Sequence, residues 1–111
     1  MRYFDVTAHK EFSLQKMKKV NLFDTEHLFC DLYCLKLGQF QKPHTHHGAD
    51  KIYYVLEGRG TFLIGDEEQV LQPGQIVLAP SGIVHGVRND YPDNLSVLVL
   101  MAPNPNRTVD H

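Results

Sequence analysis

The sequence has no tryptophan, two cysteines and almost no imbalance of charge. A formal net charge of −2 at pH 7 lacks the basic excess of surfaces that bind nucleic acid or anionic membranes, so we expect neither partner. No apolar run approaches the roughly 20 residues that a membrane-spanning helix needs. The residues after Met1 do not form the apolar stretch of a signal peptide. We therefore expect a cytoplasmic protein.

The two cysteines do not indicate a disulfide. If Cys30 and Cys34 share one strand, they lie roughly 13 Å apart, beyond the Cα separation of roughly 7 Å that a bridge allows. They alternate with Leu32 at the spacing of apolar side chains on one strand face. We expect both to be small buried core residues.

The chain is expected to form one all-β domain. A length of 111 residues with 42% hydrophobic residues suffices for one core. Short runs of β-branched and aromatic residues end at glycine, proline or other turn residues, and no long helical periodicity competes with them. This pattern indicates a closed barrel or sandwich. The expected strands are 28–37, 51–57, 61–64, 69–72, 76–79 and 95–102, in a core of about 20–102 with an N-terminal strand or arm (1–19) and an extended tail (103–111).

The histidines suggest a metal site. His44 and His46 are two residues apart, so on a strand both imidazoles point to one face, about 6.7 Å apart along the chain. Two neutral imidazoles at this spacing can bind one divalent cation, and His85 is the candidate for a third ligand. The alternative is three unrelated surface histidines, since the chain has seven.

Two spaced motifs resemble those of the cupin superfamily. The first is Gly38-x5-His44-x-His46-x4-Lys51-x6-Gly58, and the second is Gly74-x5-Pro80-x-Gly82-x2-His85-x3-Asn89. The second motif matches at every fixed position. The resemblance implies a small antiparallel double-stranded β-helix, the jelly-roll barrel of cupins. It also implies that His44, His46 and His85 lie at the barrel mouth around one divalent metal.

The resemblance fails at the fourth ligand. Where the cupin motif has glutamate, this chain has Lys51. Counted back from Gly58, Lys51 is in step with Tyr53 and should face inward, whereas Asp50 should point away. A shift in the preceding loop could still make Asp50 a ligand. His47 has the wrong parity relative to His46, and we expect it to be a solvated loop residue.

Replacing the glutamate changes the electrostatics of the site. A divalent ion held by three neutral histidines keeps a charge of +2, and an ammonium roughly 5 Å away would be repelled by several kcal/mol. Lys51 could therefore be neutral with a depressed pKa, swing out to pair with a carboxylate such as Asp50 or Glu57, or hold an anionic ligand that also touches the metal. A fourth outcome is a site that has lost its metal.

The leading functional hypothesis is a small metal-dependent cupin enzyme acting on a small anionic or oxygen-chelating molecule. Three histidines suit Fe, Mn, Ni, Cu or Zn, and Lys51 and Tyr53 are the candidate catalytic residues. Cupins with three histidines and no glutamate include cysteine dioxygenase and the β-diketone-cleaving dioxygenase, which favours a dioxygenase-like reaction by analogy. The alternatives are a non-catalytic ligand-binding or sensing module and a sugar isomerase or epimerase. We also expect a homodimer that covers the outward row Ile52, Tyr54 and Leu56.

Overall fold

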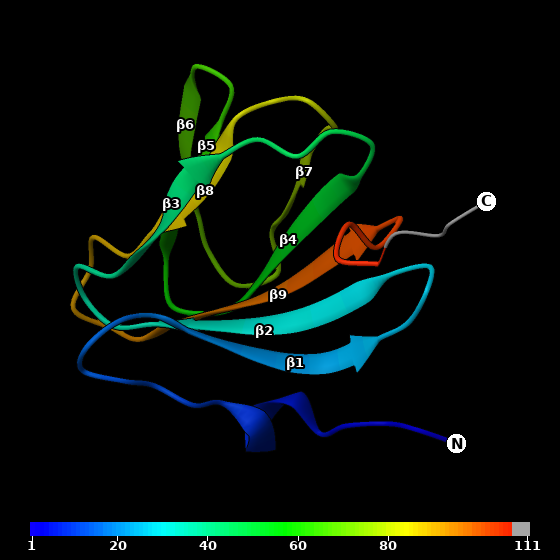
Figure 1. The fold of residues 1–111 in the computed structure, drawn as a ribbon. Coiled ribbons are helices and arrows are strands. Elements are labelled where there is room, and N and C mark those ends of the chain that lie inside the picture. Colours follow the sequence, from blue (N-terminus) through cyan, green and yellow to red (C-terminus); the bar gives the residue numbers. More distant parts are fainter. Residues whose placement is uncertain (108–111) are drawn as a thin grey trace.

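The computed structural model describes residues 1–107, and nearly all of its regular structure is antiparallel β-strand (Figure 1). Within these residues the one helical element is a single turn of 3₁₀ helix, η1 (Val6–His9), so the expected all-β class is confirmed. None of the described residues form a helix long and apolar enough to cross a membrane. The strands are β1 (Lys18–Asp24), β2 (Phe29–Leu35), β3 (Phe40–His44), β4 (Asp50–Glu57), β5 (Gly60–Ile64), β6 (Glu67–Leu71), β7 (Ile76–Ala79), β8 (His85–Arg88) and β9 (Leu95–Ala102).

The strands form two sheets that face each other. The five-stranded sheet has the order β1-β2-β9-β4-β7, and the four-stranded sheet has the order β3-β8-β5-β6. Neighbours in a sheet are often far apart in the sequence, since β9 lies between β2 and β4 and β8 lies between β3 and β5. Successive strands therefore alternate between the two sheets over much of the chain (Figure 1). This is the double-stranded β-helix that the two motifs predict.

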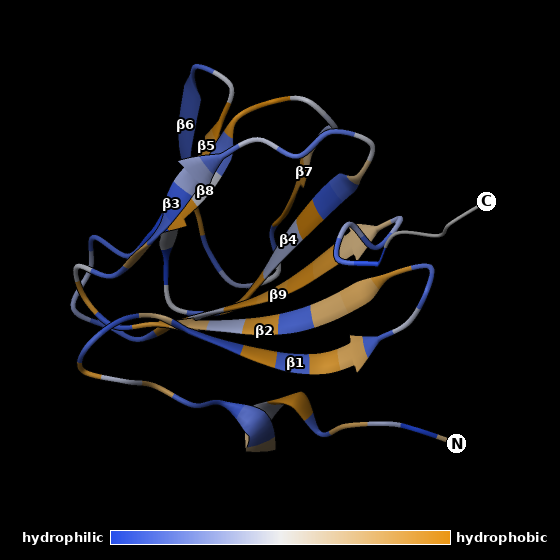
Figure 2. Ribbon diagram, in the orientation of Figure 1, coloured by the Kyte–Doolittle hydropathy of each residue, from blue (hydrophilic) through white to orange (hydrophobic). Residues whose placement is uncertain are grey.

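Six of the observed strands correspond to the six expected ranges, and β1, β3 and β8 do not. Polar residues interrupt these three strands, so their hydropathy signal is weak (Figure 2). In β3, for example, one phenylalanine is followed by glutamine, lysine, proline and histidine. By contrast β9, which pairs with strands on both sides, is hydrophobic along most of its length. Pairing with neighbours stabilises the polar strands, and a single-sequence pattern does not contain that information.

Strand β2 shows how the five-stranded sheet separates two hydrophobic layers. Phe29, Tyr33 and Leu35 belong to the main core between the sheets. The alternate residues Cys30 and Cys34, with Leu32, belong to a second cluster on the outer face. Both cysteines are buried and free, as expected.

The N-terminal segment covers part of that outer face. Val6 and Phe12 pack against the second cluster, and Figure 1 shows this segment on the side of the five-stranded sheet away from the other sheet. The rest of the face is more open, because Ile76 and Leu78 on the edge strand β7 are 62% and 50% exposed. The neighbouring outward residues of β4 are half-buried. A homodimer through this region stays a prediction.

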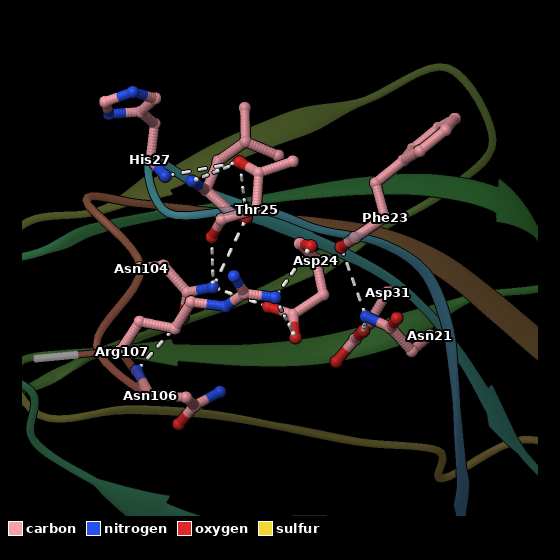
Figure 3. A network of polar contacts seen from close by, with 10 residues as sticks. Asn21, Phe23, Asp24, Thr25, His27, Asp31, Asn104, Asn106 and Arg107 are labelled. Carbon is pink, nitrogen blue, oxygen red and sulfur yellow. Dashed lines mark hydrogen bonds and ion pairs between the residues drawn. The ribbon is translucent and has the colours of Figure 1, made fainter. Parts of the chain in front are cut away.

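The residues after β9 differ from the expected extended tail. Residues 103–107 turn back against the β1–β2 connection, where Asn104 is buried (Figure 3). The Asn104 amide donates hydrogen bonds to Asp24 Oδ1 at 2.6 Å and to the Thr25 carbonyl at 2.7 Å. Arg107 adds an ion pair to Asp24 Oδ2 at 3.2 Å. These contacts satisfy the polar groups of residues 104–107 in place of water. Their partners lie about 80 residues earlier in the chain, so the local proline- and asparagine-rich sequence does not predict the turn. Residues 108–111 of the expected tail lie outside the described residues.

Candidate metal centre

Three histidines from two strands and a loop converge between the sheets. His44 ends β3 and pairs in register with His85, which begins β8. His46 lies in the loop after β3, so the prediction that it shares a strand with His44 is wrong in its local structure. Its position is set instead by the second motif, because the Gly82 amide donates a 2.7 Å hydrogen bond to the His46 carbonyl. One potential ligand atom from each of the three residues lies within 4.8 Å of the other two.

The hydrogen bonds of two of these rings leave a nitrogen free for a metal. The Nδ1 atoms of His44 and His85 lie 2.9 and 3.0 Å from the carbonyl oxygens of Lys42 and Ile83. A carbonyl only accepts, so Nδ1 carries the proton in each ring and Nε2 keeps its lone pair. Nε2 of His85 is fully buried and has no hydrogen-bond partner among the described residues. Metal-binding histidines commonly use this arrangement.

The electrostatics keep the rings neutral. Burial lowers the pKa of His44 and of His46, and it lowers the pKa of His85 to about 4. The charge of Lys51 adds to each of these shifts. Neutral imidazoles are the form that binds a metal. Three neutral imidazoles therefore fit a divalent ion. The ion would also give His85 Nε2 the partner that it lacks among the described residues.

The less favoured fourth ligand, Asp50, lies outside the cluster. Its side chain is exposed, and its Oδ1 accepts a 2.9 Å hydrogen bond from the backbone amide of Ser81. Together with the 2.8 Å bond from the Gly48 amide to the Ser81 hydroxyl, this contact ties the two motif loops to each other. The Asp50 side chain thus points away from the interior, as its position in the alternation of β4 predicts. His47 is exposed in the same loop.

Lys51 points inward, as its parity predicts, and is only 1% exposed. Its ammonium nitrogen lies 5.2 and 5.0 Å from the ring centres of Tyr33 and Tyr53 and 3.4 Å from Gln41 Oε1. None of the salt bridges between described residues includes Lys51. Burial lowers the pKa of Lys51 to about 7, and the nearby positive charge of Lys19 contributes. Of the expected outcomes, this environment fits a partly neutral amine better than one paired with a carboxylate.

Gln41 connects the polar groups at this end of the core, and the sequence reasoning missed it. Its amide nitrogen donates to the Tyr33 hydroxyl at 2.9 Å, and its carbonyl oxygen accepts from the Tyr53 hydroxyl at 2.9 Å. All three side chains are buried. Burial raises the pKa of Tyr33 and of Tyr53. The candidate catalytic residue Tyr53 therefore has its proton committed to Gln41, and its ring forms part of the core.

A pocket of about 180 Å³ is lined by His44, His46 and Lys51, and His85 is not part of its wall. Besides residues expected from the motifs, it includes Asp31 and Lys19, which the sequence reasoning did not select. A signal for Asp31 exists, since it has the parity of the inward residues Phe29 and Tyr33. The full lining is Lys19, Phe29, Asp31, Tyr33, Gln41, His44, His46, Lys51, Met101, Pro105 and Asn106.

We predict that the wild-type protein binds close to one equivalent of a divalent metal. His44→Ala and His85→Ala should each weaken metal binding by more than about 100-fold. Even the loss of a residue that only hydrogen-bonds to a metal ligand lowers metal affinity by roughly 10–100-fold. Isothermal titration with Zn(II) or Ni(II), together with elemental analysis, measures this. His47→Ala is the matched control and should bind like wild type. Unchanged binding in His85→Ala would contradict the assignment.

Lys51 should make the metal-free protein more stable as the pH rises above 7. In the unfolded chain Lys51 keeps its proton up to its ordinary pKa of 10.5, whereas in the folded chain it loses the proton at about 7. The unfolded state therefore binds more protons between these values, and the free energy of unfolding rises by up to about 1.4 kcal/mol per pH unit.

Urea denaturation at pH 7, 8 and 9 with a chelator present tests this expectation. Lys51→Met keeps the other titratable groups and should lack this increment. Equal pH dependence in the two proteins would show that Lys51 is not a buried amine of low pKa.

Comparison with known proteins agrees with this architecture. A solved structure, TT1209 from Thermus thermophilus, is 42% identical, covers 95% of this chain and 100% of its own, and superposes with a TM-score of 0.92. An RmlC-like cupin protein from Desulfovibrio desulfuricans is 27% identical, with coverages of 94% and 98% and a TM-score of 0.83. An acireductone dioxygenase from Xenopus tropicalis is 27% identical over 105 residues, which are 90% of this chain and 49% of that protein, so this chain spans about half its length. The cupin domain model matches residues 31–101, well over half of the sequence, and the chain therefore belongs to the cupin domain family.

Proposed function

We propose that the protein is a metal-dependent cupin enzyme that acts on a small, anionic, oxygen-chelating molecule. His44, His46 and His85 would hold one divalent ion, of the kinds that imidazole ligands favour: Fe, Mn, Ni, Cu or Zn. The observation that carries the proposal is the convergence of three neutral imidazoles, one with a buried and unpartnered Nε2, beside a pocket that contains a buried lysine. A bound ion would supply Lewis-acid or redox chemistry.

The protein's own residues explain why the ligand should be anionic. With lysine in place of the motif's glutamate, the protein contributes no carboxylate from this position to offset the charge of a divalent ion. Lys51 adds a proton donor when it is charged, and a carboxylate or enolate oxygen would accept a charge-assisted hydrogen bond from it. Gln41 restrains this end of the pocket through its bonds to Tyr33 and Tyr53. A pocket of about 180 Å³ is smaller than the sites that take drug-sized ligands, which suits a small metabolite.

Within this class we favour a dioxygenase-like reaction. Support comes from the acireductone dioxygenases among the relatives, at 27% to 35% identity, although these proteins are longer than the present chain. The test is O₂ uptake by the Fe(II)-loaded protein over a panel of small keto acids, enediols and diketones, with His85→Ala as the inactive control. Binding of a panel member without O₂ uptake or any other turnover would favour the ligand-binding or sensing module over the enzyme.

Lys51 provides a second test of the proposal. In the metal-loaded protein, Lys51→Met should weaken carboxylate or diketonate binding about tenfold or more by removing a charge-assisted hydrogen bond. Lys51→Glu should weaken these anions further, yet bind the metal more tightly because it restores a fourth ligand. Calorimetric titration of the metal, and then of acetate, pyruvate and acetylacetonate, measures both effects.

Lys16→Met is the matched control for this series, because Lys16 is exposed and does not line the pocket. It removes the same charge and should bind the anions like wild type. If Lys51→Glu bound the anions as well as wild type, Lys51 would not contact the ligand.

A further inference from the structure

Asp31 is a carboxylate on the inner face of the five-stranded sheet. In β2 it has the same parity as Phe29 and Tyr33, which belong to the core between the sheets. Its neighbour in register on β9 is Val99, and Val99 is in turn paired with Tyr53 on β4. Asp31 therefore faces the same interior as Tyr53, from the opposite side of β9. A carboxylate on such a face is unusual, because alternate positions of this row are apolar or aromatic.

The contacts of Asp31 leave part of its carboxylate available. The Asn21 amide donates a 2.8 Å hydrogen bond to Oδ1 and is itself positioned by a 3.1 Å bond to the Phe23 carbonyl (Figure 3). Within the described residues, Oδ2 has no hydrogen-bond partner, and no lysine or arginine lies within ion-pair distance of the carboxylate. Asp31 is half-buried, so its free oxygen is an acceptor that a ligand can satisfy.

Asp31 shares one pocket with the candidate metal ligands. His44, His46 and Lys51 line the same space, so a small ligand whose anionic oxygens are held at the histidines has Asp31 in the wall around it. A second carboxylate on the ligand would meet the negative charge of Asp31 in a partly desolvated site. A hydroxyl or ammonium there would instead donate a hydrogen bond to it.

We propose that Asp31 determines specificity, selecting ligands that join a chelating carboxylate to a hydroxyl or ammonium group and rejecting dicarboxylates. This inference rests on the proposed function, since it takes the chelating end to be at the three histidines. It names a narrower ligand class: small hydroxy- or amino-substituted acids with one negative charge at the metal end. Lys51 acts on the anionic end and Asp31 on the other, so the two residues should affect different parts of one ligand.

A matched series of four-carbon acids tests the selection. 2-Hydroxybutyrate, 2,4-dihydroxybutyrate, 4-amino-2-hydroxybutyrate and malate share an α-hydroxycarboxylate and differ at the fourth carbon, which is a methyl, a hydroxymethyl, an aminomethyl or a carboxylate group. Each is titrated calorimetrically into the Zn(II)-loaded full chain. In wild type, the dihydroxy and amino acids should bind about tenfold more tightly than malate, the difference expected for one charge-assisted hydrogen bond against one repulsive contact.

Asp31→Asn should remove this preference while leaving one equivalent of zinc bound. The amino acid should then bind about tenfold more weakly than to wild type, and malate should bind more tightly. Asp31→Thr, which suits a strand and also lacks the charge, should give the same result if the amide disturbs β2. Asp93→Asn is the charge-matched control, because Asp93 is exposed and lies outside the pocket. It should keep the wild-type order.

The outcomes separate the two levels of the proposal. If the acids bind and the order of the series is the same in wild type, Asp31→Asn and Asp31→Thr, the role of Asp31 is overturned while the metal site stands. If zinc binds but no acid binds to wild type, the proposed function fails at its chelating step, and the role of Asp31 fails with it.

Discussion

The pairing of β9 with β2 on one side and β4 on the other decides which side chains face the barrel interior. Through this register, Met101 stands between Phe29 and Lys51, and Val99 stands between Asp31 and Tyr53. A slip of one residue in either pair would exchange the inner and outer rows. A slip of β2 would turn Asp31 outward and Cys30 into the polar pocket, and a slip of β4 would turn Lys51 outward. Both sets of side chains therefore oppose a register slip. The apolar outer cluster would lose its apolar neighbours, and the polar inner residues would leave the pocket.

The cost of burying Lys51 is the main electrostatic feature of this interior. A buried ammonium without a carboxylate in contact is unfavourable, so burial lowers the pKa of Lys51. Two tyrosine rings and the Gln41 amide oxygen lie near its nitrogen and partly stabilise the charged form. The same burial keeps the three imidazoles neutral. An anion bound in the pocket would reverse part of this cost by stabilising the charged amine. Without a ligand, the buried amine of Lys51 has a free-energy cost that no carboxylate in contact offsets among the described residues. A negatively charged ligand would offset part of that cost.

The sequence predicted the fold and the metal-ligand candidates more completely than the rest of the pocket. Motif spacing was sufficient because Gly58 and Gly82 occupy left-handed turns, and a Cβ on Gly58 would clash with the Asn94 backbone. Strand parity correctly placed Lys51 inward and Asp50 outward. It failed for His46, which reaches the cluster from a loop through a hydrogen bond to the second motif. Gln41 was missed because its role depends on two tyrosines from other strands, and no local pattern encodes that contact.

The residues that line the pocket come from two kinds of position in the chain. The histidines and Lys51 occupy fixed positions of the family motifs, so the fold itself brings them together. Asp31 lies on β2 and Pro105 and Asn106 follow β9, all outside the motif positions. The last two lie beside Asn104, whose amide donates hydrogen bonds to Asp24 and Thr25, so this wall of the pocket is held by the end of β1 and the β1–β2 connection. A family can then keep the motif residues and vary these others, and ligand preference should change without loss of the fold.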